Sequence, residues 1–292
     1  MRDTILHAGS GWLVALVGVE IAILLLVAGT YRSLLSRLGH NIKLDTLIGV
    51  HLQRVVVGTV TPVGGPSSMA IFVHALRQLG VRPTDALLAV SIKSVIGNIA
   101  FLMLLVPVLF AQDPSPLLIA GTIGLVALVA ITGALLILGL RTTKPPGWML
   151  SRIPRKGLRW LVQVRSHHIS IAALAGPFAM MMTTKLAGIA MLFIALQAVG
   201  YNAEIQVPMM AYLVGMVFLM VAPVFQGIGV VEVTMALALQ RLGVPPAAAV
   251  GATLLTRAGE LWLPLAAGIT LQALDTVGRR FRTPAPHGSP LG

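Results

Sequence analysis

The sequence predicts an all-α polytopic membrane protein built as an inverted repeat with two re-entrant helical hairpins. The membrane assignment rests on composition: of 292 residues, 57% are apolar and only 10% are charged, and the mean hydropathy is +0.91. A soluble protein of this size has no core large enough to cover so much apolar surface. The hairpins and the inverted repeat rest on a sequence pattern that occurs twice.

That pattern is an apolar segment broken by proline and glycine, followed by a second helical segment with a recurring ending. The breaks are Thr61–Pro66 and Ala222–Gly229, and the segments after them end in Leu-Gly-Val-x-Pro at Leu79–Pro83 and Leu242–Pro246. Equivalent residue numbers differ by 163 at these endings and by 161 upstream of the breaks. Interrupted apolar segments at matching points of two halves indicate the binding site of an inverted-repeat transporter.

The first half is expected to contain two membrane spans and one hairpin. Residues 11–34 and 84–111 are long enough to cross the bilayer. Residues 44–60 are apolar but include Arg54, and at about 1.5 Å per residue they barely reach across. A second half-helix over 66–79 begins at a proline, which is favoured in a first turn, and returns the chain to the side from which it entered.

The second half repeats this order from the opposite side of the membrane. Spans are expected at 116–140, 169–199 and 246–274, and the second hairpin enters over 207–223 and returns by Leu242. Because three crossings separate the two hairpins, the repeats are inverted. The span at 116–140 has no counterpart in the first half, so either the first half is shortened or the given chain begins downstream of its natural start.

These elements form a single transmembrane domain over residues 1–282, with repeat 1 at about 11–111 and repeat 2 at about 116–274. The proline- and glycine-rich tail at 283–292 is expected to be disordered. The loop at 141–168 carries seven Lys and Arg and no acid, and its mixture of basic and apolar residues predicts a helix lying in the lipid interface or a solvated loop.

The charge distribution predicts the orientation of the chain. The formal net charge is +12, and in this topology 15 of the 21 Lys and Arg lie at one membrane face. By the positive-inside rule that face is cytoplasmic, so the N-terminus is outside and the C-terminus is inside. Asp113 and Glu204 then lie outside, and Lys156 and Arg280 lie inside. The basic excess therefore reports orientation and contact with anionic lipid rather than nucleic-acid binding.

Ionisable side chains inside the membrane segments are the best candidates for function. At a helix centre each costs about 2.5–3.5 kcal/mol, so they are expected to face a cavity or one another. The seven are Glu20, Arg54, Lys93, Lys185, Glu232, Arg257 and Glu260. Two other readings stay open: Arg257 and Glu260 form a structural pair at i,i+3 spacing, and Glu20 lies near the outer interface.

The breaks add backbone donors to this set. Half-helices that begin near Pro66 and Ile228 direct unpaired N–H groups and positive dipole ends toward the midplane, which favours an anion. Packing of the two hairpins alone is the structural alternative. The candidate substrate-binding residues are Arg54, Pro62, Gly64, Gly65, Ser67, Ser68, Lys93, Lys185, Gln226, Gly227, Gly229, Glu232, Arg257 and Glu260.

Catalytic and metal sites are not indicated. The sequence has no phosphate loop, no Gly-x-Ser-x-Gly and no His-Glu-x-x-His, and the absence of cysteine excludes disulfides and thiolate metal sites. His167 and His168 are adjacent and point to opposite sides of a helix, which makes a poor metal pair. We expect no catalytic residue, no metal and no cofactor.

Several segments resemble the transmembrane region of the lysylphosphatidylglycerol synthase/flippase family, which includes the N-terminal domain of the multiple peptide resistance factor and standalone members. These segments are Thr61–Gly65, Gly227–Glu232, Leu242–Val244 and Arg257, and the resemblance covers residues from about 20 to 275. This chain has Pro66-Ser67-Ser68 where the family's first hairpin often carries an acid, and it lacks the family's first span. No aminoacyl-transferase domain follows the last span, so lysyl-lipid synthesis is not expected.

The resemblance implies flippase-like translocation of a polar or aminoacylated phospholipid across a bacterial or archaeal cytoplasmic membrane. The expected partners are membrane lipids, anionic or aminoacylated, with a homodimer or a lipid-synthesis enzyme as further candidates and no nucleic acid. One alternative is a flippase for a polyprenyl-linked sugar or hopanoid lipid. Others are a non-transporting membrane partner of a lipid- or glycan-modifying enzyme, and a membrane transferase with Glu232 or Glu260 as base.

Overall fold

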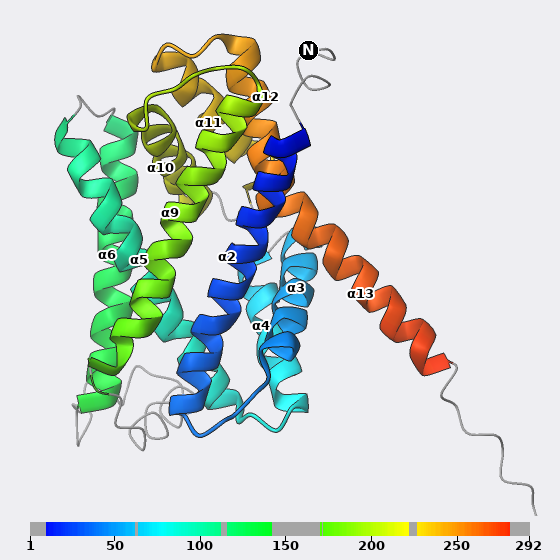
Figure 1. The fold of residues 1–292 in the computed structure, drawn as a ribbon. Helices are drawn as coiled ribbons and strands as arrows, with labels where there is room; N and C mark the ends of the chain where they lie inside the picture. Colours follow the sequence, from blue (N-terminus) through cyan, green and yellow to red (C-terminus); the bar gives the residue numbers. More distant parts are fainter. Residues whose placement is uncertain are drawn as a thin grey trace, which may run out of the picture.

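Every regular element is helical in the residues that the computed structural model describes, which are 10–61, 64–111, 116–141, 170, 172–221 and 227–280 (Figure 1). The helices in chain order are α2 (Ser10–Arg37), α3 (Leu44–Val60), α4 (Gly64–Gln78), α5 (Pro83–Ala111), α6 (Pro116–Arg141), the 3₁₀ turn η1 (Ala172–Leu174), α9 (Ala175–Ala198), α10 (Gln206–Val221), α11 (Val230–Arg241), α12 (Pro246–Arg257), the π-helical turn η3 (Ala258–Trp262) and α13 (Leu263–Arg280). The all-α fold predicted from the sequence is confirmed.

Three helical segments are long and apolar enough to cross a membrane: Gly11–Arg37, Pro83–Val108 and Ala172–Ala198. Shorter apolar helices lie at Ile119–Ile131 and Gln206–Met220. All five coincide with segments predicted to enter the membrane. Large apolar side chains are exposed along α2, α5 and α6, as expected for surfaces that contact lipid tails.

The two predicted breaks separate α3 from α4 and α10 from α11. The helices of each pair pack against each other. In Figure 1 the α2–α3 and α4–α5 loops lie at the lower end of the bundle, whereas the α9–α10 and α11–α12 loops lie at the upper end. The first break is closed locally, because the backbone N–H and the hydroxyl of Thr61 both donate to the carbonyl of Val57, at 3.1 and 2.7 Å.

Helix ends in the two halves agree with the offsets read from the sequence. The ends of α2 and α9 differ by 161 residues, and so do those of α3 and α10; the ends of α4 and α11 differ by 163, and so do the starts of α5 and α12. The turns also match. Gly39 and Gly200 have φ of +87° and +80°, and Gly80 and Gly243 have +82° and +88°. Glycine adopts this left-handed backbone without strain, which ends each helix in the same way.

Each half has its own apolar core. Buried side chains of α2, α3, α4 and α5 form one cluster, centred on Tyr31, Phe72 and Leu76, and those of α9, α10, α11 and α12 form most of the other. Helices α2 and α9 pack along each other and join the halves. Small residues allow this approach: the Sδ atom of Met180 lies 3.5 Å from the position that a Cβ on Gly29 would take.

The last predicted span, 246–274, is helical throughout but is not a uniform α-helix. The π-helical turn η3 interrupts it, with the N–H of Leu263 donating to the carbonyl of Ala258, an i→i+5 bond. Beyond the turn, α13 runs outward from the bundle (Figure 1) and packs on α3. There Gly268 is in close contact, because a Cβ would lie 2.9 Å from the carbonyl oxygen of Leu52.

Two helix starts differ from the prediction. Helix α4 begins at Gly64 rather than Pro66, and α11 begins at Val230 rather than near Ile228, after a turn at Gly227–Gly229. The expected interfacial helix within 141–168 and the tail at 283–292 lie outside the described residues, as do Asp113 and Lys156.

Candidate functional site

A cluster of two cations and two aromatic rings lies inside the first half. The Nη1 atom of Arg54, on α3, donates to the hydroxyl of Tyr31, on α2, at 2.6 Å. The Arg54 guanidinium also lies 5.9 Å from the ring centre of Phe72, and the ammonium of Lys93, on α5, lies 5.6 Å from that of Tyr31. We call Arg54, Lys93, Tyr31 and Phe72 the cationic cluster. Its rings attract positive charge without neutralising it.

Lys185 connects this cluster to the second half. It lies on α9, half-buried, with its ammonium 5.8 Å from the ring centre of Phe101. Its charge interacts with that of Lys93 on one side and with that of Glu260 on the other. The predicted site residues Arg54, Lys93, Lys185 and Glu260 therefore follow one another through the protein interior.

A second cluster is acidic. Glu260 lies in η3, and a hydrogen bond joins its carboxylate to the hydroxyl of Tyr212 on α10. Glu20, on α2, is 2% exposed, and its charge interacts with that of Glu260. The Tyr212 ring lies directly on Gly188 of α9, where any Cβ would overlap it. We call Glu20, Glu260 and Tyr212 the carboxylate cluster. Glu20 is thus buried among the helices of the bundle.

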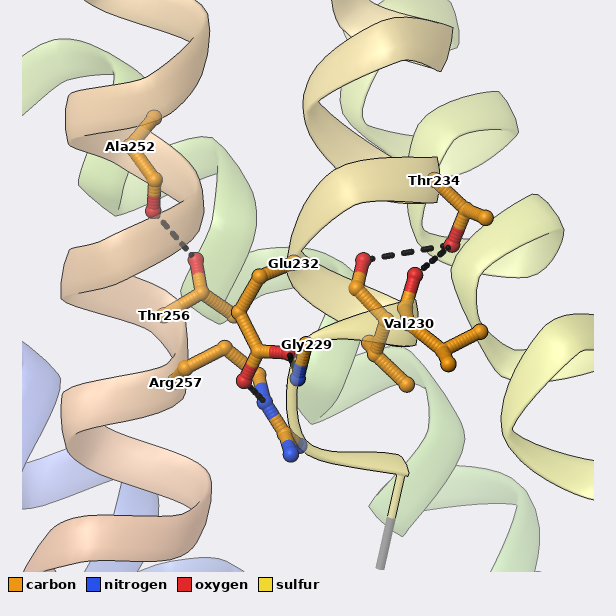
Figure 2. Close-up of polar contacts among 8 residues, drawn as sticks. Gly229, Val230, Glu232, Thr234, Ala252, Thr256 and Arg257 are labelled. Carbon is orange, nitrogen blue, oxygen red and sulfur yellow. Dashed lines mark hydrogen bonds and ion pairs between the residues drawn. The ribbon is translucent and has the colours of Figure 1, made fainter. Parts of the chain in front are cut away.

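The third group is a buried ion pair at the start of α11 (Figure 2). The Nε atom of Arg257, on α12, donates to Oε1 of Glu232 at 2.8 Å, and Oε2 of Glu232 accepts the backbone N–H of Gly229 at 2.7 Å. The Arg257 side chain is 5% exposed and that of Glu232 is 19% exposed. Glu232 therefore caps its own helix. Its carboxylate is the negative charge that the positive end of the α11 dipole favours.

This arrangement changes the expected pairing of Arg257. The i,i+3 spacing suggested a pair with Glu260, but the Arg257 Nε bonds Glu232 of the neighbouring helix and Glu260 bonds Tyr212. Arg257 can reach Glu232 because α11 and α12 pack against each other. Arg257 and Glu260 still interact electrostatically.

The remaining predicted residues belong to the breaks. Gly64 starts α4, Gly65 is exposed, and Ser67 is half-buried. Ser68 is 4% exposed, and its hydroxyl donates to the carbonyl of Gly65 at 2.8 Å, so this donor is used within the first turn. Gly227 has φ of +72°, and a Cβ there would lie 2.7 Å from Leu219. Pro62 and Gln226 lie outside the described residues.

The aromatic partners of these charges, Tyr31, Phe72, Phe101 and Tyr212, were not predicted from the sequence. A signal was present, because the chain has only three tyrosines and two of them bind the buried charges. A buried tyrosine needs a partner for its hydroxyl, and in an apolar segment an ionisable residue is the obvious candidate. The packing of Tyr212 on Gly188 had no such signal, since the two residues come from different helices.

Three buried polar atoms have no hydrogen-bond partner within the described part of the chain: Oε2 of Glu20, Nδ1 of His51 and Oγ1 of Thr253. Glu20 belongs to the carboxylate cluster. His51 precedes Arg54 on α3, and its ring interacts with the charges of Arg54 and Lys93. Unsatisfied atoms are rare in protein interiors, and each calls for an explanation such as strain, a functional role, an ordered water or an ion. Two of the three therefore lie at the charged clusters.

The fold and these clusters define a polytopic helical membrane protein with ionisable side chains inside the bundle. The family model described as the lysylphosphatidylglycerol synthase TM region matches residues 1–268, and the chain belongs to that family. Comparison with curated proteins gives no match, and neither does comparison with solved structures.

Proposed function

We propose that the protein translocates a polar or aminoacylated phospholipid across the cytoplasmic membrane of a bacterium or archaeon, without covalent chemistry. The headgroup would pass between the two helix-break-helix units while the acyl chains stay in the bilayer. Membership of the family of lysylphosphatidylglycerol synthase transmembrane regions supports this class of function.

The cationic cluster is the observation that carries the proposal. Arg54 and Lys93 lie within the bundle, and their partners in the described structure are a hydroxyl and aromatic rings rather than carboxylates. Two positive charges held this way favour an anion, and guanidinium and ammonium groups bind phosphate oxygens strongly in a low-dielectric site. A lipid phosphate provides such an anion inside a membrane. The acyl chains of a lipid stay in the bilayer, which would explain why the site lies inside a membrane domain and not in a water-soluble one.

The helix arrangement supports an inverted repeat with re-entrant hairpins. The loops that flank α3 and α4 lie at one end of the bundle, and those that flank α10 and α11 lie at the other (Figure 1). Broken helices inside a bilayer leave backbone groups that must face protein or a polar cavity. In an inverted-repeat transporter such breaks surround the substrate, and alternate opening of the two sides moves it.

The decisive assay uses proteoliposomes with a fluorescent phospholipid that a membrane-impermeant reductant bleaches only in the outer leaflet. We expect the protein to increase the rate at which inner-leaflet lipid becomes accessible, for an anionic or aminoacylated headgroup more than for a zwitterionic one. Arg54→Met should insert and purify normally yet lower this rate about tenfold or more, since a hydrogen bond to a charged group contributes about 1.5–3 kcal/mol. Arg37→Met, at the exposed end of α2, is the matched control.

The outcomes separate the candidate functions. Equal rates for Arg54→Met and the unmodified protein would leave Arg54 with a structural role only and remove the main support for the proposal. Inert liposomes together with a co-purifying lipid-modifying enzyme would favour the non-transporting partner. A covalently altered lipid would instead indicate a membrane transferase. Translocation of a polyprenyl-linked sugar or hopanoid lipid alone would keep the mechanism and change the substrate.

A further inference from the structure

Two carboxylates from distant parts of the sequence lie on helical elements that pack together. Glu20 lies on α2 and Glu260 in η3, and these elements pack together. Their charges interact, although 240 residues separate them in the sequence. Glu20 is 2% exposed, and its Oε2 has no partner among the described residues. A carboxylate buried to this degree needs a cation, a donor or a proton.

The neighbouring charges do not satisfy both carboxylates. Arg257 interacts with Glu260, but its Nε is bonded to Glu232, and Lys185 is the other cation that interacts with Glu260. The charge of Glu20 interacts with that of Glu260, and its Oε2 accepts no hydrogen bond from the described residues. One proton on the acid pair removes one of its two like charges. Two facing carboxylates that share one proton are a recognised solution to like-charge repulsion in low dielectric.

We propose that Glu20 and Glu260 form a binding site for one exchangeable proton, and that binding and release of this proton drive the movement of lipid. The inference rests on the proposed translocation, and it adds the energy source. The pair passes between a doubly ionised state and a singly protonated state. The proton comes from water at one membrane face and leaves to water at the other, so no oxidant, nucleotide or other co-reactant is required.

The groups around the pair determine how it responds to pH. Tyr212, from α10, bonds Glu260, and Lys185, from α9, and Arg257, from α12, interact with the same carboxylate. Beyond Lys185 the charge of Lys93 on α5 follows, and then that of Arg54 on α3, beside the ring of His51. The proton site is therefore electrostatically continuous with the cationic cluster. Loss of the proton makes the interior more negative and weakens the hold of that cluster on an anionic headgroup.

The π-helical turn gives a structural route for the coupling. Glu260 lies in the middle of η3, and π-helical turns inside α-helices occur frequently at functional sites. Gly259 packs on Met191 of α9, where a Cβ would lie 2.9 Å from the sulfur. A change in the Glu260 contacts therefore acts on the junction between α12, α13 and α9. Helix α13 in turn packs on α3, which carries Arg54.

Infrared difference spectroscopy of the purified protein between about pH 5 and pH 9 tests for the proton directly, because a protonated carboxyl group has a carbonyl band that a carboxylate lacks. We expect one such band, which disappears as pH rises. It should be lost in Glu20→Gln, shifted in Tyr212→Phe and unchanged in Glu204→Gln, which replaces an exposed carboxylate. Glu260→Asp offers a second variant if Glu260→Gln does not fold.

Absence of a pH-dependent carboxyl band, or its persistence in Glu20→Gln, would overturn the proposal. A band that changes as much with sodium concentration at constant pH as it does with pH would also overturn the proposal, because that would indicate a cation site. Lipid translocation in proteoliposomes should respond to an imposed pH gradient in the unmodified protein and not in Glu20→Gln, and an equal response of both would also overturn it. A band with the expected behaviour in a protein that moves no lipid would leave the proton site standing and reject the translocation.

Discussion

The buried charges of this protein are stabilised in chemically different ways, and the difference indicates their roles. Arg257 has a carboxylate partner, so its charge is neutralised within the protein. Arg54 and Lys93 lie against tyrosine and phenylalanine rings, which contribute about 0.5–2 kcal/mol each and supply no negative charge. A neutralised charge is suited to holding helices together, whereas a charge that remains is suited to binding an anion.

Arg257→Met is expected to destabilise the protein, unlike Arg54→Met. Without the guanidinium, the Glu232 carboxylate stays largely buried without its main cation, at a cost of about 3–5 kcal/mol for a fully buried pair and less here because Glu232 is 19% exposed. Glu232→Gln in the same chain removes that charge and keeps an oxygen for the N–H of Gly229. The double variant should therefore recover part of the loss, as measured by unfolding in detergent.

Additive effects of the two substitutions would contradict this account, because residues in one bonded pair are expected to show a coupling free energy of about 0.5–3 kcal/mol. Normal unfolding of Arg257→Met with complete loss of lipid translocation would instead return Arg257 to the substrate site.

At the scale of the helices, the glycines and prolines at helix ends and helix starts made most of the fold predictable. The starts of α5 and α12 coincide with Pro83 and Pro246, and α2 and α9 each end two residues before a glycine, Gly39 or Gly200. These residues act on the local backbone, so a sequence shows their effect directly. The broken helices were predicted for the same reason.

The parts of the site that depend on contacts between distant helices were not predictable in this way. The π-helical turn at Ala258–Trp262 requires one inserted residue in the hydrogen-bond ladder, and no residue type enforces it. The sequence therefore did not show that Arg257 bonds Glu232 of another helix besides interacting with Glu260, three residues away. The ionisable residues were identified from their cost in a membrane, but their aromatic partners were set by packing.

Gly188→Ala tests the contact that holds Tyr212 beside Glu260. An added methyl group would overlap the Tyr212 ring, so we expect a loss of stability of about 1–3 kcal/mol. Gly176→Ala, on the same helix with nothing within 4 Å, should be neutral or slightly stabilising. Tyr212→Leu in the Gly188→Ala protein should relieve the overlap, so the two changes together should cost less than their sum. Equal unfolding of both glycine variants would contradict this packing.

For the molecule as a whole, the arrangement of the two apolar cores and the two opposed ends bears on the proposed mechanism. Each half contributes most of one buried cluster, and α2 and α9 form the main seam between the halves. The charged clusters extend across this seam, from Arg54 and Lys93 in the first half through Lys185 to Glu260 in the second. Movement of one half against the other would therefore change the environment of the site, and it would also shift Phe101, Leu105 and Val108 of α5, which pack in the core of the second half.

The orientation of the two halves leads to a prediction that covers the entire molecule. The α2–α3 and α4–α5 loops lie at one end of the bundle and the α9–α10 and α11–α12 loops at the other (Figure 1). Asn41→Cys and Arg82→Cys represent the first end, and Glu204→Cys and Pro245→Cys the second, all at exposed positions in a chain without cysteine. An impermeant thiol reagent applied to intact cells should label Glu204→Cys and Pro245→Cys. Asn41→Cys and Arg82→Cys should react only after permeabilisation, since Arg32, Arg37, Lys43 and Arg77 place their end in the cytoplasm by the positive-inside rule.

Labelling of Asn41→Cys and Arg82→Cys from opposite sides would show that α3 and α4 together cross the membrane, and it would reject both the first hairpin and the inverted repeat.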